Sequence, residues 1–263
     1  MNTHSLTTNL QPLVDGDVLR YRCGFAADSQ RRKQLKEQHP DLSEGDIEQL
    51  LSDEDYLGYA LSNVKESLTS TQEMFTLPPL QLYLSGSGNF REQVATILPY
   101  KGNRTARKPK YYEEIGQYMK DVWRAIVVEG QEADDALGIE QYGRTDNSTV
   151  IVSIDKDLDM IPGWHYNLMR KELYEVSERD ADIQLFRQML IGDRTDNIPG
   201  IEQVGDVRAE KLLASVDYDV DAVRSLVKAK YQEQYANDWE RAYREVGTLL
   251  WIRREPEQEC VLL

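Results

Sequence analysis

Cysteine and histidine are scarce in this chain. Its two cysteines, Cys23 and Cys260, lie near opposite ends of the 263 residues, and its three histidines are scattered. A structural zinc site needs about four such ligands in close spacing, so the sequence excludes one. Two thiols this far apart suit a reducing compartment better than they suit a disulfide.

Long hydrophobic runs are absent as well. No apolar stretch is long enough to span a membrane, and residues 1–10 lack the charged start and apolar middle of a signal peptide. The overall composition, 40% hydrophobic and 29% charged, is ordinary for a globular protein. We therefore predict a cytoplasmic protein with no membrane partner.

Positive charge is outnumbered, and the formal net charge is −15. Taken alone, this argues against a nucleic-acid partner, because phosphate binding normally requires a basic face. However, Lys101, Arg104, Arg107, Lys108 and Lys110 fall within one stretch, and the local field rather than the total charge steers a ligand. Bound cations would offset part of the negative charge. The sequence contains no phosphate-binding Walker loop, dinucleotide fingerprint or Ser/His/Asp arrangement.

Carboxylates repeatedly follow apolar runs. They occur in four clusters: Asp15; Glu132, Asp134 and Asp135; Asp155 and Asp157; Asp193 and Asp196. An apolar run that ends in Asp is typical of a buried strand, and open α/β sheets bind ligands at the carboxyl edge of their strands. Carboxylates gathered there raise one another's pKa values. A divalent cation resolves this repulsion, and Mg²⁺ is a natural partner for oxygen ligands.

Each cluster also has a purely structural explanation. Acidic residues at 132–135 suit a helix start, and Asp155 and Asp157 suit a turn after a strand. Asp193 and Asp196 either share the face of a helical turn or belong to a loop that ends at Pro199. The occurrence of all four clusters at element boundaries of one chain favours a metal site.

The hydrophobic periodicity predicts an α/β chain with a helical lobe. Strands are expected at 11–14, 80–84, 125–128 and 149–154, and helices at 17–27, 111–122, 133–141, 181–191, 207–216, 220–229 and 239–250. Residues 28–75 are polar with apolar residues at helical spacing, which predicts an insert of one or two surface helices. Residues 101–110 are expected to form a loop. Alternation of strand and helix implies a parallel sheet with right-handed crossovers.

Five motifs, in this order, resemble those of the 5′-nuclease (flap endonuclease) superfamily, most of all bacteriophage 5′→3′ exonucleases and the N-terminal nuclease domain of bacterial DNA polymerase I. The motifs are Leu13–Gly16, Tyr100–Arg104, Glu132–Asp135, Ile154–Asp157 and Gly192–Gly200. The resemblance implies a PIN-like (resolvase-like) parallel-sheet catalytic domain at 1–180, with 28–75 as the helical insert and with a helical arch. It also implies a helix–three-turn–helix DNA-binding lobe at 181–263.

The resemblance also assigns roles in a site with two Mg²⁺ ions, for which Mn²⁺ is the alternative. Asp15, Glu132, Asp134 and Asp155 would serve the first ion, with Asp135 beside them, and Asp157, Asp193 and Asp196 would serve the second. Lys101 and Arg104 would contact the scissile phosphate, and Arg107 and Lys108 would bind DNA nearby. Tyr100 would stack on a terminal base; the alternative is a loop aromatic that faces solvent.

The hairpin at 198–205 resembles the family element that holds duplex phosphates through its backbone, with a monovalent cation such as K⁺. The DNA-binding residues implied there are Gly200, Val204, Gly205, Arg208 and Lys211. Glycines let a backbone approach phosphate, and the helix that follows offers free amides. The alternative is an ordinary turn between helices, and Asp206 and Glu210 stand where a basic residue would be more usual.

One position departs from the family pattern. Ser85 stands where the family usually has an Asp after the second strand. We expect a metal-dependent 5′→3′ exonuclease or flap endonuclease, a monomer that acts on duplex DNA with a 5′ end or flap, and also on RNA–DNA hybrid, in the cytosol of a bacterium or phage-infected host. A DNA-junction binding protein with little cleavage is the alternative. An RNA-directed nuclease of the PIN-like group fits the 198–205 hairpin less well, and an acidic scaffold would make every motif a coincidence.

Overall fold

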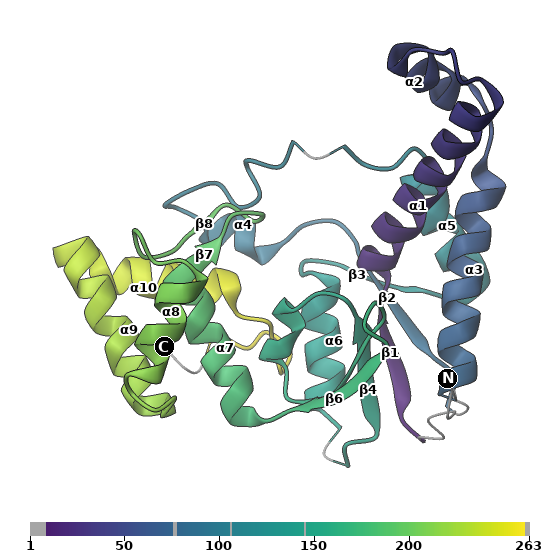
Figure 1. Ribbon diagram of the computed structural model, residues 1–263. Coiled ribbons are helices and arrows are strands. Elements are labelled where there is room, and N and C mark those ends of the chain that lie inside the picture. Colours follow the sequence, from purple (N-terminus) through teal and green to yellow (C-terminus); the bar gives the residue numbers. More distant parts are fainter. Residues whose placement is uncertain (1–8, 76–77, 106, 145, 261–263) are drawn as a thin grey trace. The chain divides into compact units, whose positions relative to one another are not determined.

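The computed structural model describes residues 9–75, 78–105, 107–144 and 146–260 (Figure 1). The chain forms two compact units: unit 1 comprises Met1–Leu84 and Ala106–Val127, and unit 2 comprises Ser85–Thr105 and Val128–Leu263. These units divide at other places than residue 180. The functional domains expected at 1–180 and 181–263 therefore stay a prediction.

Unit 1 begins with two parallel strands. β1 (Gln11–Asp15) pairs with β2 (Gln81–Ser85), and Leu13, Val14 and Asp15 lie opposite residues 81–83. Both strands were predicted, and their parallel pairing agrees with the parallel sheet that was expected. Gly16 follows β1 at a place where a Cβ atom would lie 2.4 Å from the carbonyl oxygen of Tyr83. The chain can therefore turn from strand to helix here because this residue has no side chain. A third short strand, β3 (Ile126–Val128), follows the last helix of this unit.

Helices make up the rest of unit 1. They are α1 (Gly16–Gln38), α2 (Glu44–Asp53), α3 (Leu57–Met74) and α5 (Tyr112–Trp123). α1 packs against α2, α3 and α5, and it runs alongside α3 in Figure 1. Residues 28–75 were expected to form an insert of one or two surface helices. Instead, the first eleven of these residues continue α1, and α2 and α3 account for most of the others. The hydrophobic pattern of residues 28–38 gave little indication that the first helix continues, because Leu35 is the buried residue of α1 in this range.

Unit 2 contains three neighbouring strands of the main sheet, with mixed directions. β4 (Thr149–Ser153) pairs in parallel with β5 (Gly163–Asn167), and β5 pairs antiparallel with β6 (Glu172–Val176). The buried strand β4 and the helix α6 (Ala133–Tyr142), which packs against it, were predicted. β5 and β6 were not predicted, and the antiparallel pairing of β6 departs from the expectation of a purely parallel sheet. A 3₁₀ turn, η1 (Asp157–Met160), joins β4 to β5.

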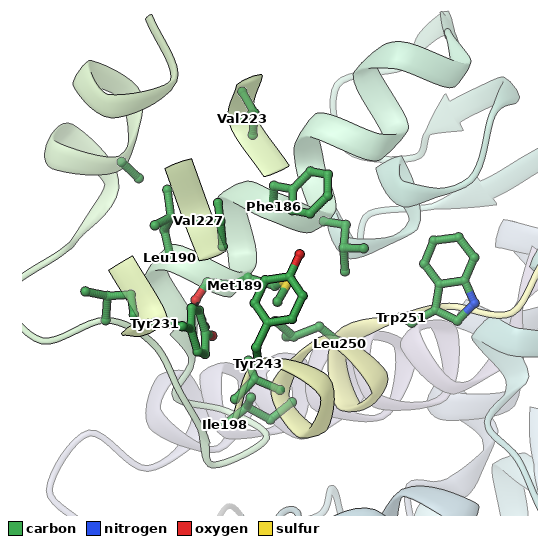
Figure 2. Packing of buried hydrophobic residues seen from close by; sticks show 14 of the residues in the cluster. Phe186, Met189, Leu190, Ile198, Val223, Val227, Tyr231, Tyr243, Leu250 and Trp251 are labelled. Atoms are coloured by element: carbon green, nitrogen blue, oxygen red, sulfur yellow. Dashed lines mark hydrogen bonds between the residues drawn. The ribbon is translucent and has the colours of Figure 1, made fainter. Parts of the chain in front are cut away.

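The helical lobe of unit 2 contains α7 (Glu178–Ile191), α8 (Asp206–Ala214), α9 (Val220–Tyr235), η2 (Ala236–Asp238) and α10 (Trp239–Leu250). All four α-helices were predicted, with ends that differ by a few residues. Figure 2 shows how side chains from α7, α9 and α10 meet in one hydrophobic cluster. At its centre the ring of Tyr231 meets Tyr243 edge-on at 5.4 Å, and its hydroxyl donates to the carbonyl of Met189 at 2.8 Å.

A segment without helix follows the short helix α4 (Phe90–Val94). Residues 95–105 and 107–111, where the resemblance places the base of an arch, consist of turns and extended chain. Glu245 of α10 fixes the start of this segment, because its carboxylate accepts hydrogen bonds from the backbone amides of Thr96 and Ile97, both at 2.6 Å. Within the described ranges, no helix has both the length and the hydrophobicity that a membrane span requires. Cys23 and Cys260 are both buried.

Candidate active site

The Tyr100–Arg104 motif lies on the hairpin that carries the Asp193 motif. The backbone amide of Lys101 donates to the carbonyl of Asp196 at 2.8 Å, and the side chain of Asn103 donates to the carbonyl of Arg194 at 2.7 Å. In return, the side chain of Asn197 donates to the carbonyl of Pro99 at 2.9 Å. Two motifs that are more than ninety residues apart therefore form one surface of unit 2.

This contact pairs predicted phosphate ligands with predicted metal ligands. The ammonium group of Lys101 contacts the carboxylate of Glu132 and lies 3.6 Å from Asp196 Oδ2. The guanidinium of Arg104 lies 2.6 Å from Asp196 Oδ1. The carboxylates of Glu132 and Asp196 are 18% and 17% exposed, whereas Arg104 is 42% exposed. The side chains of Lys101 and Arg104 are thus more exposed than the carboxylates they pair with, and an anion from solvent could reach Arg104 at the surface.

Tyr100 is half-buried beside these ion pairs. Its hydroxyl lies 3.0 Å from Glu132 Oε2 and 2.9 Å from Asp196 Oδ2, and its ring packs against the hydrophobic cluster of the lobe. Burial and the charge of Glu132 raise the pKa of this hydroxyl above its ordinary value. The alternative of an aromatic ring that faces solvent is therefore wrong. The prediction that Tyr100 stacks on a base remains a prediction.

The acidic cluster at 132–135 caps α6, as its structural explanation required. Glu132 is the N-cap residue, and its backbone amide donates to Asp135 Oδ2 at 3.1 Å. Asp134 lies half-buried in the first turn. The amide of Ala133 donates to Ser85 Oγ at 2.9 Å, so Ser85 also serves the start of this helix. The residue that departs from the family pattern is therefore a capping residue here.

Asp135 has a structural partner that the sequence analysis missed. Arg91 donates to both of its carboxylate oxygens, at 2.6 and 2.9 Å, and also to the carbonyls of Leu249 and Trp251. Both side chains are buried. Although burial acts to raise it, the hydrogen bonds and the charge of Arg91 lower the pKa of Asp135 below its ordinary value. Asp135 therefore serves the framework of unit 2, and its predicted metal role remains a prediction.

Asp155 and Asp157 lie in a tight turn after β4. The amide of Asp155 donates to Ser153 Oγ at 3.0 Å, and the amide of Asp157 donates to Asp155 Oδ1 at 2.9 Å. Burial is the largest cause that raises the pKa of Asp155, and the charge of Asp193 adds to it. Burial, followed by the charges of Asp155 and Asp193, raises the pKa of Asp157 to about 7. The negative charges of these three carboxylates therefore repel one another.

Asp193 and Asp196 lie in a two-stranded hairpin, so the alternative of a shared helical face is wrong and that of a loop is confirmed. β7 (Gly192–Asp193) pairs antiparallel with β8 (Ile198–Pro199). Asp193 Oδ1 accepts the amide of Thr195 at 2.7 Å. A Cβ atom on Gly200 would lie 2.3 Å from the backbone carbon of Ile191. The end of α7 and the hairpin can touch because no side chain separates them.

Three of the predicted residues lie in unit 1. Asp15 ends β1, is 2% exposed, and accepts the amide of Val18 through Oδ1 at 3.0 Å. Arg107 pairs with Glu48 and Lys108 with Glu113, each at 3.2 Å. The metal role of Asp15 and the DNA-binding roles of Arg107 and Lys108 remain predictions.

The predicted DNA-binding hairpin divides into exposed and buried residues. Gly205, Arg208 and Lys211 are exposed at and after the start of α8. Val204 is buried in the lobe, and its amide donates to the carbonyl of Ile201 at 3.1 Å. The carbonyl of Gly200 accepts from the side chain of Gln234 at 3.2 Å. Within this element the exposed residues are the ones that could meet phosphate.

The donor chemistry of Asp155, Asp157 and Asp193 fits a hard divalent cation, because such a cation prefers carboxylate oxygens and would offset the repulsion between these half-buried acids. Glu132 and Asp196 supply further oxygens, which are paired with Lys101 and Arg104. Among residues 9–75, 78–105, 107–144 and 146–260, no three Asp, Glu, His or Cys side chains stand so that they could hold one ion together. The fit therefore rests on the type and charge of the ligands.

Comparison with known proteins gives several sequence relatives. No family model matches the chain. The chain is 27% identical to DNA polymerase I of Caldicellulosiruptor bescii over 161 residues, which are 51% of this chain and 19% of the polymerase. It is 29% identical to a 5′-3′ exonuclease of Buchnera aphidicola over 145 residues, 47% of this chain and 48% of that protein. The chain thus spans about a fifth of the polymerase and about half of the exonuclease.

Solved structures share the fold. The bacteriophage T5 D15 protein crystallised with metal ions superposes with a TM-score of 0.57 and 16% identity, and the match covers 91% of this chain and 90% of that one. A T5 D15 flap endonuclease in a pseudo-enzyme–product complex with DNA and metal ions gives 0.57 and 17% identity, over 90% and 87% of the two chains. The architecture is therefore that of a PIN-like α/β protein.

The sequence relatives and the structural neighbours point to the same group of proteins. The relatives named DNA polymerase I and 5′-3′ exonuclease, with the T5 structures, confirm the predicted resemblance to the 5′-nuclease superfamily.

Proposed function

We propose that this protein is a metal-dependent, structure-specific nuclease that hydrolyses phosphodiester bonds at 5′ ends or flaps of duplex DNA, in replication or repair. The observation that carries the proposal is the contact of the Tyr100–Arg104 segment with the Asp193 hairpin. It places Lys101 and Arg104 against Glu132 and Asp196. The relatives named for exonuclease and flap endonuclease activity support the same reaction.

In this proposal, Lys101 and Arg104 exchange carboxylate oxygens for the oxygens of the scissile phosphate. Both groups are positively charged donors, so they stabilise negative charge that develops on the phosphate. Because Arg104 is the more exposed of the two, it meets the phosphate first. Tyr100 holds Glu132 and Asp196 in place through its hydroxyl and would stack on a terminal base.

Asp155, Asp157 and Asp193 would hold divalent metal. Glu132, Asp134 and Asp196 would join them as ligands once Lys101 and Arg104 bind the phosphate. Mg²⁺ is the proposed ion and Mn²⁺ the alternative. Bound divalent cations supply Lewis-acid chemistry at phosphate and water oxygens. The exposed residues Gly205, Arg208 and Lys211 would hold the duplex, with K⁺ at the 198–205 hairpin. Action on RNA–DNA hybrid, a monomeric state and a cytoplasmic location complete the proposal.

Cleavage of a 5′-labelled flap duplex tests the proposal, with Mg²⁺ in one arm and EDTA in the other. Product near the junction is expected with Mg²⁺ alone. Asp155→Asn and Asp193→Asn should lose this product while their circular dichroism spectra stay unchanged. Asp221→Asn is the matched control, because it removes the same charge from a side chain that is 86% exposed on α9. Full Mg²⁺-dependent cleavage by both site variants would show that the site is wrongly assigned.

The second candidate function is binding of DNA junctions with little cleavage. It is favoured by the ion pairs that Glu132 and Asp196 already make and by Ser85, whose hydroxyl caps α6. This candidate predicts a salt-sensitive gel shift of flap DNA in EDTA, and no product after Mg²⁺ is added.

A further inference from the structure

Gln188 is a buried polar residue on the apolar side of α7. Its side chain is 7% exposed, and its neighbours Leu185, Phe186 and Met189 are fully buried. A buried amide without a hydrogen-bond partner destabilises a protein. The amide nitrogen of Gln188 has a partner, since it donates to Asp157 Oδ1.

This hydrogen bond joins two elements that carry acidic residues. α7 packs against η1, the turn that begins at Asp157. The same helix ends at Ile191 and leads directly into Asp193. Gln188 therefore ties Asp157 to the helix that delivers Asp193.

The turn before η1 transmits this restraint to Asp155. The backbone amide of Asp157 donates to Asp155 Oδ1 at 2.9 Å, so the Asp155 carboxylate is held to the backbone of the residue that Gln188 contacts. Asp193 follows the end of α7 directly, so the three acids lie on elements that the hydrogen bond of Gln188 joins into one acidic group. A shift of η1 relative to α7 would change the spacing within that group.

The chemistry of the donor suits a residue that orients a ligand. A neutral amide fixes one carboxylate oxygen and leaves the negative charge of Asp157 in place. A lysine or arginine at this position would add a positive charge beside the acidic group and oppose a divalent cation. Partners that orient metal ligands in this way typically contribute 10- to 100-fold to metal affinity.

We propose that Gln188 is a positioning residue that sets the place of Asp157 relative to Asp193 and thereby the affinity of this acidic group for a divalent cation. The inference rests on the proposed function, because it assumes that Asp155, Asp157 and Asp193 bind metal. It concerns the protein alone and requires no DNA.

Binding of Mn²⁺, measured by the electron paramagnetic resonance signal of the free ion, tests the inference. Gln188→Met keeps the length of the side chain and removes the donor, so it should weaken Mn²⁺ binding by about 10- to 100-fold. Gln188→Asn, which withdraws the amide by one methylene group, should weaken it as well and serves if the methionine variant does not fold. Gln141→Met is the matched control, because Gln141 is also a buried amide of unit 2 but donates to the carbonyl of Pro162. It should leave Mn²⁺ affinity unchanged.

Two further readouts separate positioning from a general structural role. In an Asp157→Asn background, Gln188→Met should change Mn²⁺ affinity by less than about twofold, since the two residues act as one unit. In flap cleavage, Gln188→Met should raise the Mn²⁺ concentration for half-maximal rate, while kcat at saturating Mn²⁺ stays near that of the unsubstituted protein.

The outcomes are distinct. Equal Mn²⁺ affinity in Gln188→Met, Gln188→Asn and the unsubstituted protein would overturn the inference and leave the proposed function standing. Failure of the unsubstituted protein to bind Mn²⁺ would overturn the proposed metal dependence and this inference together.

Discussion

Arg91 and Asp135 form a two-pronged ion pair inside unit 2, with nitrogen–oxygen distances of 2.6 and 2.9 Å. The guanidinium also donates to the carbonyls of Leu249 and Trp251, which stand on either side of Leu250, the last residue of α10. One side chain thus joins α4, α6 and the chain after α10. Because both side chains are buried, water cannot solvate either charge if the ion pair is broken.

Replacing Arg91 by methionine should strongly destabilise the protein. Asp135 would keep a buried negative charge without its partner, and breaking a buried pair in this way costs about 3–5 kcal/mol. Urea denaturation, followed by circular dichroism, would measure the change in the free energy of unfolding. The double variant Arg91→Met/Asp135→Leu should recover a large part of the loss. A double variant as unstable as the sum of the two single variants would contradict this view of the pair.

Adding one methyl group to Gly200 should disturb the hairpin, whereas adding it to Gly205 should not. The Cβ atom of alanine at 200 would lie 2.3 Å from the backbone of Ile191, but no atom lies within 4 Å of a Cβ placed on Gly205. Overpacking of this kind costs about 1–3 kcal/mol. Thermal unfolding of Gly200→Ala and Gly205→Ala compares the two. Equal melting temperatures would show that the close approach at Gly200 does not constrain the fold.

Asp157 should make the stability of the metal-free protein fall as pH rises. Burial and the neighbouring carboxylates raise its pKa to about 7 in the folded chain, above the value of about 3.9 in an unfolded chain. Between these values the folded state holds a proton that the unfolded state lacks, so stability declines with increasing pH. The unfolding free energy of the unsubstituted protein minus that of Asp157→Asn should therefore decrease from about pH 4 to pH 7.

Titration of both proteins in EDTA isolates this effect from all other carboxylates. A difference that is constant from pH 4 to pH 7 would mean that Asp157 titrates like an exposed residue. Mn²⁺ should offset the loss above pH 7 in the unsubstituted protein, because bound cation stabilises the ionised carboxylates.

Ser85→Asp should strengthen divalent-cation binding without harming the fold. An aspartate oxygen can accept the amide of Ala133 as the serine hydroxyl does now, since both residue types cap helices well. The new negative charge would join the end of β2, where the family pattern has an acid. Ser85→Asn is the control, because it supplies the same acceptor without charge. Equal Mn²⁺ affinity in both variants would argue against a metal near residue 85.

Much of the fold was predictable because its signals are local. β1 and β4 are apolar runs that end beside Asp15 and Asp155, and the lobe helices show apolar residues at a period near 3.6. β5 and β6 escaped prediction because their burial does not alternate clearly along the strand. Their stability comes from the pairing of residues 163–167 with residues 172–176 and with β4, which periodicity does not reveal.

The candidate site was predictable in its residue types but not in its pairings. The motifs identified Lys101, Arg104 and the carboxylates as participants. They gave no sign that Lys101 would meet Glu132, that Arg104 would meet Asp196, or that Arg91 would neutralise Asp135. Such contacts depend on how separate elements pack in three dimensions, and no sequence spacing encodes them. Gln188 was invisible for the same reason: on α7 it looks like one more residue of an amphipathic helix.

The contact between Lys101 and the backbone of Asp196 has a consequence for synthesis of the protein. The two residues are joined only after the ribosome has added nearly a hundred residues beyond the Tyr100–Arg104 motif. Until then the Tyr100–Arg104 motif lacks the hairpin to which it hydrogen-bonds, and Lys101 is not yet held beside Glu132 by this contact. The site thus closes late during translation, and a nascent chain that stops short of Asn197 carries its motifs without an assembled centre.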